Sequence, residues 1–515
     1  MDLKPKQTYL DLEPPAPVRT RAHSVVALAT AALGVLAIAG LAITNSGSGV
    51  ADHTTEGEMV LSGLHAPGTS AGSKSVGSVE TGRKIVGALA EKPALTTTAP
   101  PTTVTAPAVA ALRKSTAGSA QSSTTPPAAA PRGNPPGGGS AWTPTGPVYW
   151  LAADGNDGAD GSEGSPWRNF GSVLRRLHPG DTLLVKAGTY GNTRTGPAIN
   201  IEGVNGTAGA PVTIAAAPGQ QVNILGGGWQ VIRVAGSSYV DVRGFDVSGS
   251  AASDRSTANG IEVNGAHHVR LVANTVHDVG GGGIVGVRAN HVTIDSNRVY
   301  NTSMWNGNQS SAISLFESAN IGGGNNGDGF SFYVRNNIVY NNKNLVGAVT
   351  DGNCIIIDSN RNTRYGGGTY VANNLCYANG GRGVHVFIAD NVLAVNNTLV
   401  GNLTSREMSG QGELSAIQAT NVTFRNNLVI PSRAGAGAHE YAASGISYAN
   451  NLYAGSPHER QTGSDLVVDD ARIGSDYVPL AGSPAIDAGT TDGAPSVDRR
   501  GRTRTGAPDV GAYEG

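Results

Sequence analysis

Three oxygen-bearing side chains, Asp351, Asn353 and Asp358, surround one short apolar run at residues 354–357. Carboxylate and amide oxygens are the ligands that Ca²⁺ takes in proteins. A bound Ca²⁺ neutralises a carboxylate on a substrate and so makes the proton beside that carboxylate easier to remove. The spacing therefore predicts a Ca²⁺ site built from these three side chains.

Three basic side chains near this site could move a proton. Arg382 and His385 occur together in the run Arg-Gly-Val-His, and Lys343 is one of only two lysines after residue 147. Removal from water lowers the pKa of a cationic side chain, more readily for lysine than for arginine. We expect Lys343 or Arg382 to act as a general base, and His385 to bind substrate or donate a proton.

Three further residues are candidates for substrate binding. Trp305 and Tyr365 lie on the longest insertions between repeats, where an aromatic ring could stack on a sugar. Glu317 follows an apolar strand one repeat before Asp358. With the basic and oxygen-bearing groups, these residues suit β-elimination on a uronate-containing polysaccharide, because the proton removed there is adjacent to a carboxylate.

Each of these positions also has a purely structural interpretation. The run 351–353 is a common turn sequence, and Asp358 could simply pair with a nearby arginine. Arg382 could be a surface residue at a glycine-rich corner, Lys343 a solvated loop residue, and the loop aromatics covers for a repeat edge. His385 is harder to explain in this way because alternation with its valine neighbours turns it outward.

One phrase recurs from residue 260 to 451: a turn, two short strands, and then asparagine followed by alternating apolar residues. The shortest step between these asparagines is 23 residues, and longer steps carry insertions. Such a unit cannot bury its own apolar face, so successive units must stack as coils of a solenoid. Stacking at roughly 4.8 Å would place the asparagines in a ladder of side-chain amides. The ladder positions are Asn274, Asn297, Asn337, Asn374, Asn397, Asn427 and Asn451.

The strand after each turn decides which side chains share a face. Alternation places its first and third residues inside and its second outside. His385 then falls in one outward column and Asp358 in the next. The following coil is aligned on residues 417–419, which puts Gln418 in the column of His385 and Thr420 in that of Asp358. The residues expected to converge on one outer face are Asp351, Asn353, Asp358, Arg382 and His385.

The stretch 148–514 resembles the right-handed parallel β-helix of secreted bacterial proteins in the pectate-lyase-like superfamily. The amphipathic run Phe170–Leu177 is similar to the helix that plugs the first coil of such proteins, and 483–489 with 509–514 are similar to their closing segment. The resemblance implies an all-β solenoid with an amino-terminal helical cap and says little about activity. The Gly-Asp-Asp motif of polygalacturonases, the Asp-Pro-His motif of mannuronan epimerases and the Trp-Ile-Asp-His motif of the commonest pectate lyases are absent.

The amino-terminal part is organised differently. Residues 1–23 are polar and basic, and 24–44 form an uncharged segment long enough to cross a bilayer. Basic residues before it and acidic ones after it predict a cytoplasmic amino terminus and an exported body. A signal peptide cleaved near residues 40–42 is the alternative, although the length favours a retained anchor. Residues 45–147, rich in Ala, Pro, Thr, Ser and Gly, are expected to be a disordered tether before the folded domain at 148–515.

The composition limits the classes of binding partner that the sequence predicts. A net charge of −2 over 515 residues gives no reason to expect nucleic acid. We expect an acidic polysaccharide as partner, membrane contact only through 24–44, and a monomer. Cys354 and Cys376 are the only cysteines and lie about one coil apart in an exported domain, which permits a disulfide. Cys376 also fits as a reduced core residue, because other coils have valine at its place.

Three functions are compatible with these residues. The first is a Ca²⁺-dependent polysaccharide lyase, which the residue set favours. The second is a glycoside hydrolase that uses Asp351 and Asp358. The third is a surface protein that binds glycans without turnover. A lyase would leave an ultraviolet-absorbing unsaturated product and stop in chelator, whereas a hydrolase would release reducing ends without that absorbance.

Overall fold

The computed structural model describes residues 142–193, 196–249, 258–432, 437–455 and 462–515. The predicted segments 1–23 and 24–44 and nearly all of the linker 45–147 lie outside this part of the chain. Within it, none of the helices has the length and apolar character needed to cross a membrane. Trp142, just before the first strand, packs its ring on Arg243, with 4.7 Å between the ring centroid and the guanidinium carbon.

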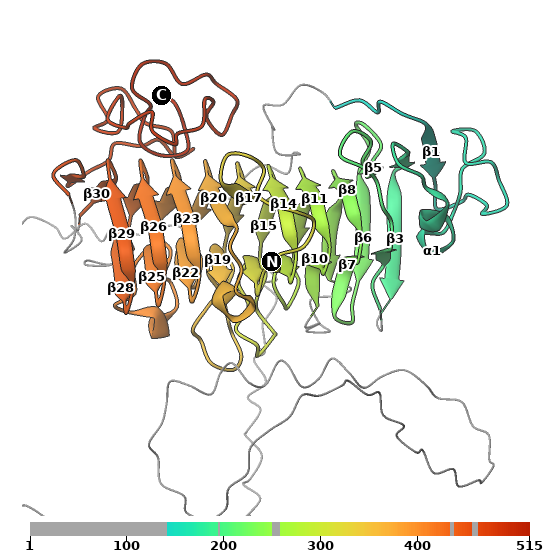
Figure 1. The fold of residues 1–515 in the computed structure, drawn as a ribbon, viewed down its shortest axis with the longest axis horizontal. Coiled ribbons are helices and arrows are strands. Elements are labelled where there is room, and N and C mark those ends of the chain that lie inside the picture. The colour runs from blue at the N-terminus through green and yellow to red at the C-terminus, as the bar shows by residue number, and fades with distance from the viewer. Residues whose placement is uncertain (1–141, 194–195, 250–257, 433–436, 456–461) are drawn as a thin grey trace, which may run out of the picture. The chain divides into compact units, whose positions relative to one another are not determined.

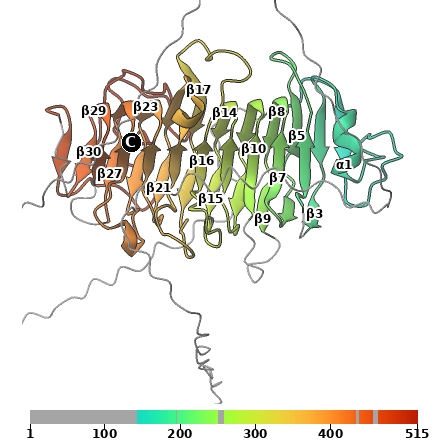
Figure 2. The same cartoon turned by 60° about the horizontal axis from the view of Figure 1, so that its bottom comes forward.

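Nearly all regular structure is β-strand, arranged as three parallel sheets along one axis (Figure 1, Figure 2). From β4 to β30, consecutive strands go to different sheets, and every third strand returns beside its predecessor in the same sheet. Each turn of the chain is therefore one coil of a right-handed parallel β-helix. The all-β solenoid predicted from the asparagine repeat is confirmed.

The strands of the three sheets, here called sheets 1, 2 and 3, have the following bounds. Sheet 1 contains β1 (Val148–Leu151), β2 (Thr182–Val185), β5 (Val212–Ala216), β8 (Ser238–Arg243), β11 (His267–Val272), β14 (Asn290–Asp295), β17 (Phe330–Arg335), β20 (Gly368–Ala372), β23 (Asp390–Val395), β26 (Thr420–Arg425) and β29 (Ser444–Ala449). Sheet 2 contains β3 (Gly188–Thr193), β6 (Val222–Gly226), β9 (Asp246–Gly249), β12 (Thr275–His277), β15 (Arg298–Tyr300), β18 (Ile338–Tyr340), β21 (Leu375–Tyr377), β24 (Thr398–Val400), β27 (Leu428–Ile430), β30 (Leu452–Ala454) and β31 (Leu466–Val468). Sheet 3 contains β4 (Ile199–Glu202), β7 (Gln230–Ala235), β10 (Asn259–Asn264), β13 (Ile284–Val287), β16 (Ile313–Phe316), β19 (Ile355–Asp358), β22 (Val384–Phe387), β25 (Leu414–Ile417) and β28 (Ala438–Tyr441).

Alternation along the strands builds the core. In sheet 3, Ile261 pairs in register with Ile284, and Ile284 with Ile313, and all three side chains are fully buried. Equivalent inward residues of each coil thus stack on those of the next, which removes from water the apolar faces that a single coil would expose. Because the register is fixed in this way, the outward residues of successive coils also stand above one another.

The predicted amide ladder is confirmed. All seven ladder asparagines are fully buried, and each of the first six donates from Nδ2 to Oδ1 of the asparagine one coil further along, at 2.9–3.2 Å. Its second Nδ2 hydrogen reaches a backbone carbonyl, as from Asn374 to Val334 at 2.8 Å. The ladder ends at Asp465, whose Oδ1 accepts two hydrogen bonds from Asn451.

A second ladder runs through the turns after sheet 2 and was not predicted. Thr302 donates to Asn342, Asn342 to Asn379 at 2.7 Å, and Asn379 to Asn402 at 2.8 Å. Asn402 then donates to the fully buried carboxyl of Glu413 at 2.7 Å, and burial raises the pKa of Glu413 to about 8. Both ladders therefore end on a carboxyl group, which can accept the last hydrogen bonds.

A short helical segment covers the first coils, where the sequence predicts a cap. The α-helix α1 (Phe170–Val173) continues into a 3-10 turn, η1 (Leu174–Arg176), and Phe170, Val173 and Leu174 are buried. The ring of Phe170 meets that of Tyr190 edge-on, with 5.8 Å between centroids. Further 3-10 turns among the described residues are η3 (Asn360–Thr363) and η4 (Arg406–Met408).

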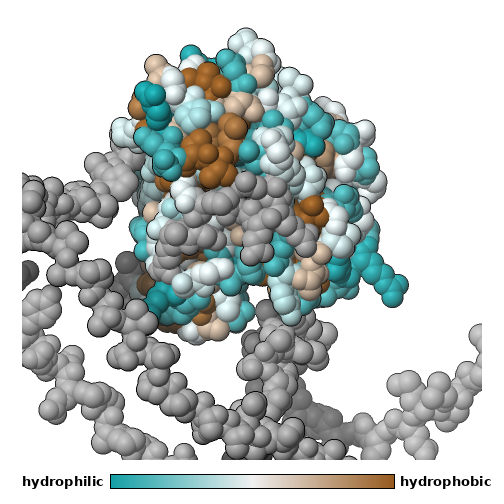
Figure 3. Space-filling view, turned by 90° about the vertical axis from the view of Figure 1, so that its left-hand side faces the viewer, coloured by the Kyte–Doolittle hydropathy of each residue, from teal (hydrophilic) through white to brown (hydrophobic). Residues whose placement is uncertain are grey.

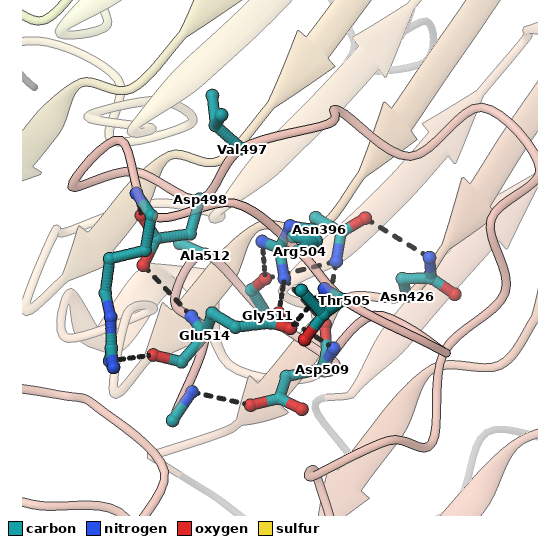
Figure 4. A network of polar contacts seen from close by, with 12 residues as sticks. Asn396, Asn426, Val497, Asp498, Arg504, Thr505, Asp509, Gly511, Ala512 and Glu514 are labelled. Carbon is teal, nitrogen blue, oxygen red and sulfur yellow. Dashed lines mark hydrogen bonds and ion pairs between the residues drawn. The ribbon is translucent and has the colours of Figure 1, made fainter.

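The carboxy-terminal segment was expected to close the end of the solenoid, and this expectation is wrong. Residues 469–515 instead lie along the side of sheets 1 and 2 (Figure 1). Asn396 donates to the carbonyls of Asp509 and Gly511, and buried Arg504 donates to Glu514 at 3.0 Å (Figure 4). At the end itself, which faces the viewer in Figure 3, Val467 of β31 is 42% exposed.

Cys354 and Cys376 form a disulfide, with 5.8 Å between their Cα atoms. Both side chains are also fully buried in the core. The two interpretations left open by the sequence are thus not exclusive: Cys376 occupies the inward valine position and is oxidised as well. The disulfide joins the residue that directly precedes β19 of sheet 3 to β21 of sheet 2 in the same coil.

His277 supports a pH-dependent contribution to stability. Its ring donates to Asp246 and Asp278 at 2.8 and 2.7 Å and stacks on Tyr300. These contacts raise the pKa of His277 from 6.5 to about 9, although burial opposes the shift. Stability from a raised pKa is fully present below the unfolded value and is lost as pH rises through the folded value.

We therefore expect His277→Gln to lower the free energy of unfolding by roughly 2–3 kcal/mol at pH 6 and by much less above about pH 9. Urea titrations at both pH values measure the difference. A deficit that is the same at both would contradict the prediction, and His178→Gln, on an exposed side chain, is the control.

Candidate functional site

Two of the candidate residues, His385 and Asp358, lie on outward positions of sheet 3. His385 of β22 and Asp358 of β19 are in neighbouring outward columns, as predicted. The next coil differs from the expectation, because β25 starts at residue 414. The register partner of His385 is Ser415 and not Gln418, and the same three-residue shift removes Thr420 from the column of Asp358.

Arg382 is a fixed, buried cation in the turn before β22. Its side chain is 6% exposed, Nη1 donates to the carbonyl of Thr350 at 3.1 Å, and Nη2 donates to Gln411 at 2.6 Å. Burial lowers the pKa of Arg382 to about 10, and nearby Asp351 opposes this shift. The guanidinium therefore stays charged at neutral pH, so Arg382 is suited to bind an anion and not to act as a base.

His385 is a neutral imidazole with an unused nitrogen. The residue is 3% exposed, and burial, with the charge of Arg382 as a second cause, lowers the pKa of His385 well below 6.5. Its Nδ1 has no hydrogen-bond partner within the described part of the chain. A buried polar atom without a partner is rare and costly, which points to a ligand. A group in this state is better suited to accept a proton than to donate one.

Two carboxyl groups near these residues hold protons more tightly than usual. Burial raises the pKa of Asp351 to about 6, and the charge of Arg382 partly opposes this. Burial also raises the pKa of Asp358 to about 7, with further contributions from the charges of Asp351 and Glu317. Titration near neutral pH is the property that acid and base catalysts require.

The predicted Ca²⁺ ligands do not form a ligand set. The Oδ1 of Asn353 accepts the backbone N–H of Arg382 at 2.8 Å, and its Nδ2 points to Asp351 at 2.6 Å. The amide oxygen is thus already used inside the protein. Among the described residues, no three or more His, Cys, Asp or Glu side chains are arranged to hold a metal ion. These residues do not fit the ion as predicted, and Ca²⁺ binding stays a prediction.

Two neighbouring loops border the turn that carries Asp351. Asn344 accepts the backbone N–H of Asp351 at 3.1 Å and donates to two carbonyls of the loop 301–312, which contains half-buried Trp305. Lys343 directly precedes Asn344, and its backbone N–H donates to the carbonyl of Thr302. The role of Lys343 as a base stays a prediction.

The remaining predicted substrate residues are placed differently. Tyr365 was expected to stack on sugars, but it is only 8% exposed and packs edge-on against Phe332 in the core. Its hydroxyl donates to Asn290 at 2.7 Å, so this prediction is wrong: the insertion folds back onto the coil. Glu317 follows β16 at the other end of the strand from Asp351 and pairs with Arg288 at 3.2 Å.

The sequence alignment missed residues on the coils after β22. His439 follows Ser415 in the column of His385, and Gln411 holds Arg382. A signal for them was present, since the first strand residue precedes the ladder asparagine by 13 residues in every coil without an insertion there. The matching pairs are Ile261 with Asn274, Ile284 with Asn297, Val384 with Asn397, Leu414 with Asn427, and Ala438 with Asn451.

Aromatic rings flank the charged cluster in the second column. The column of Asp358 contains Phe316 one coil before it, Phe387 one coil after it, and Tyr441 two coils further. Tyr441 is 63% exposed. Asp358 separates Phe316 from Phe387, and Ile417 separates Phe387 from Tyr441, so successive rings are two coils apart. At roughly 4.8 Å per coil this spaces the rings by about 10 Å along a line on which a chain of sugars could lie.

No protein-family model matches the chain, and no curated protein matches it. Among solved structures it is similar to pectate lyase Pel9A, with 19% identity, a TM-score of 0.41, and 71% of this chain and 96% of that chain covered. It is also similar to an alginate lyase from Paenibacillus sp. (17% identity, TM-score 0.32, 58% and 94% covered) and to a GH136 lacto-N-biosidase from Eubacterium ramulus (15% identity, TM-score 0.37, 62% and 57% covered). All three likenesses are distant, so the function is inferred from the site itself.

Proposed function

We propose that the protein is an exported, polysaccharide-active enzyme, most specifically a lyase that cleaves a uronate-containing glycan by β-elimination on the outer face of sheet 3. The observation that carries the proposal is the pairing of a buried, fixed guanidinium, Arg382, with a neutral imidazole, His385, whose Nδ1 has no partner in the described chain. The first group suits the uronate carboxylate and the second suits the proton beside it.

Each step of the reaction has a group on this face. Arg382 binds the uronate carboxylate and stabilises the charge that develops on it. His385 takes the C5 proton on Nδ1, and the C5–H electrons form the C4=C5 double bond as the C4–O4 bond breaks. Asp358, with its pKa raised to about 7, gives its proton to the leaving O4. The products are an unsaturated sugar and a new chain end, so atoms and charges balance.

The pH profile follows from these two titrating groups. The pKa of His385 lies well below 6.5, so the base is already neutral in mildly acidic solution. The acid form of Asp358 is lost as pH rises through about 7. We expect kcat to fall by about tenfold per pH unit above this value. Rates in a constant-ionic-strength buffer series measure it, and a profile still rising at pH 9 would rule out Asp358 as the acid.

A glycoside hydrolase is the second candidate. The raised pKa values of both Asp351, about 6, and Asp358, about 7, favour it, because hydrolysis needs one protonated and one ionised carboxyl. The two reactions leave different products. Hydrolysis gives reducing ends without a double bond, whereas elimination gives both a reducing end and an enoate.

The deciding experiment incubates the full chain with polygalacturonate, alginate, xylan and cellulose oligomers and records enoate absorbance and reducing ends together. Enoate formed only from the acidic glycans supports the lyase. Reducing ends without enoate support the hydrolase, and binding without either product overturns the enzymatic proposal.

Metal removal tests the predicted cofactor. Because the amide of Asn353 is already engaged and Arg382 supplies a fixed positive charge, we expect turnover to persist after dialysis against chelator. Loss of turnover that added Ca²⁺ restores would support the sequence-based expectation in its place. Mg²⁺ at equal concentration is the matched control, since it demands a tighter octahedral site.

A further inference from the structure

A second hollow lies on a different face, between sheet 1 and the carboxy-terminal segment. We call it the strap cleft, because residues 492–497 cross over it. It has a volume of about 500 Å³ and is walled by β14, β17 and β20 on one side and by the strap on the other. This volume is within the roughly 300–1,000 Å³ of sites for small ligands. No residue of the proposed catalytic site on sheet 3 lines it.

Three aromatic rings form the floor of the strap cleft. Phe330 and Tyr370 are 5.3 Å apart between centroids, and Tyr333 and Tyr370 are 6.1 Å apart with 61° between their ring planes. Each ring is half-buried, so part of it remains available. Rings of this kind present an apolar face to the C–H groups of a sugar while their rims offer polar contacts.

Polar groups around the rings are held in place by the protein. Arg335 donates to Asp295 at 2.8 Å, and the hydroxyl of Tyr333 donates to Asp328 at 2.5 Å. Carboxylate oxygens have further lone pairs that could accept from sugar hydroxyls. Because Arg335 is already neutralised by Asp295, the charge left over in the cleft is the negative one of Asp328.

The strap is fixed to the solenoid at both ends of the cleft. Tyr370 donates to the carbonyl of Gly493 at 2.9 Å, and Asn373 donates to that of Val497 at 2.8 Å. Asn373 also accepts from Arg504 at 3.0 Å, which connects Val497 through Asn373 to the carboxy-terminal network. A cleft with rigid walls loses little entropy when it takes a ligand. A second hollow of about 350 Å³ continues past Phe330 toward β23 and β26 and lengthens the available path.

We propose that the strap cleft is an accessory binding site for a short, neutral oligosaccharide. The aromatic floor, the acceptors around it and the rigid wall suit a polyhydroxylated ring. No ion pair of Asp328 occurs within the described ranges, and its negative charge disfavours a uronate, so the ligand differs in charge from the substrate proposed for sheet 3. The two sites therefore recognise different parts of a mixed glycan, or different glycans at one cell surface.

Isothermal titration calorimetry on the full chain tests the proposal, with cellotetraose, xylotetraose, mannotetraose and chitotetraose as neutral probes and tetragalacturonate as the acidic one. At least one neutral tetrasaccharide is expected to bind. Tyr333→Ala and Tyr370→Ala are each expected to weaken that binding by about tenfold, as loss of one stacking ring implies. Ala494→Trp, which places bulk in the cleft and leaves the floor unchanged, is expected to abolish it.

Matched variants distinguish a loss of ring stacking from a loss of folding and from an effect of the proposed catalytic site on sheet 3. Tyr370→Phe keeps the ring and loses only the hydrogen bond to the strap, so binding within about twofold of wild type is expected. His385→Ala removes the proposed base on sheet 3 and should leave the neutral ligand bound as before. The proposal is overturned if no neutral probe binds the wild-type protein. It is also overturned if Tyr333→Ala, Tyr370→Ala and Ala494→Trp all bind the neutral probe like wild type, or if these variants lose binding of tetragalacturonate only.

Discussion

Replacement of His385 by alanine is expected to lower kcat on the acidic glycan by about 10²–10⁴-fold, which is the usual loss when a general base is removed. The reason is local: Nδ1 of His385 is buried without a hydrogen-bond partner in the described structure, and His385 is close enough to Arg382 for that charge to lower its pKa. Substrate binding through Arg382 remains, so KM should change far less than kcat.

His439→Ala is the matched control for this variant. His439 is in the same outward column, two coils further along, and its Nδ1 also lacks a described partner. A loss of equal size in both variants would show that the column is needed for folding or general binding and not for proton transfer. Melting temperatures of both variants, and a pH profile of the residual activity, complete the comparison. In the pH profile of the His385 variant, the contribution from ionisation of the base should disappear. The fall in rate above about pH 7, which comes from deprotonation of Asp358, should remain.

Asn374→Ala is expected to lower the free energy of unfolding by roughly 3–5 kcal/mol. Asn374 is fully buried, accepts from the backbone and side chain of Asn337, and donates to Val334 and Asn397. Alanine removes all four hydrogen bonds and leaves the partner groups buried and unsatisfied. Denaturant unfolding of the full chain, followed by circular dichroism, gives the difference.

Asn421→Gly is the control for the ladder variant. Asn421 is exposed, has a positive φ of 56° that glycine also adopts, and makes one side-chain contact, to Asn391. We expect a change within about 0.5–1 kcal/mol. If Asn374→Ala costs no more than this control, then the buried amide stack does not stabilise the coils.

The solenoid was predictable because its signal is repetitive. The ladder asparagines recur in seven successive coils, from Asn274 to Asn451, together with the alternating strands, so an error at one coil does not affect the others. The second ladder was not predicted, although Asn342, Asn379 and Asn402 each follow a first-ladder asparagine by five residues. Its position holds asparagine in these three coils, whereas its two ends are Thr302 and Glu413. A ladder whose residue type changes from coil to coil leaves a weaker repeat in the sequence than one built from asparagine throughout.

The candidate site was predicted less completely, for two physical reasons. Outward side chains contribute nothing to the apolar pattern. The three-residue misalignment of one coil, which put Gln418 in the place of Ser415, therefore did not show in the hydrophobicity of the sequence. Tyr365 was misplaced because an insertion of unknown course can return to the core, and a tyrosine hydroxyl finds a buried acceptor there in Asn290. Charge and hydrogen bonding at Asn353 and Arg382 required coordinates, because they depend on which atoms face each other.

The ladders have a direction: every member donates its hydrogen bond to the next, and the last member is a carboxyl group, that of Asp465 or of Glu413. Duplicating or deleting one whole 23-residue coil would therefore leave the last carboxyl group of each ladder, and the hydrogen bonds between all other members, intact. The length of the outer face, and with it the number of consecutive sugars it can span, can change during evolution by internal copying without redesign of either end.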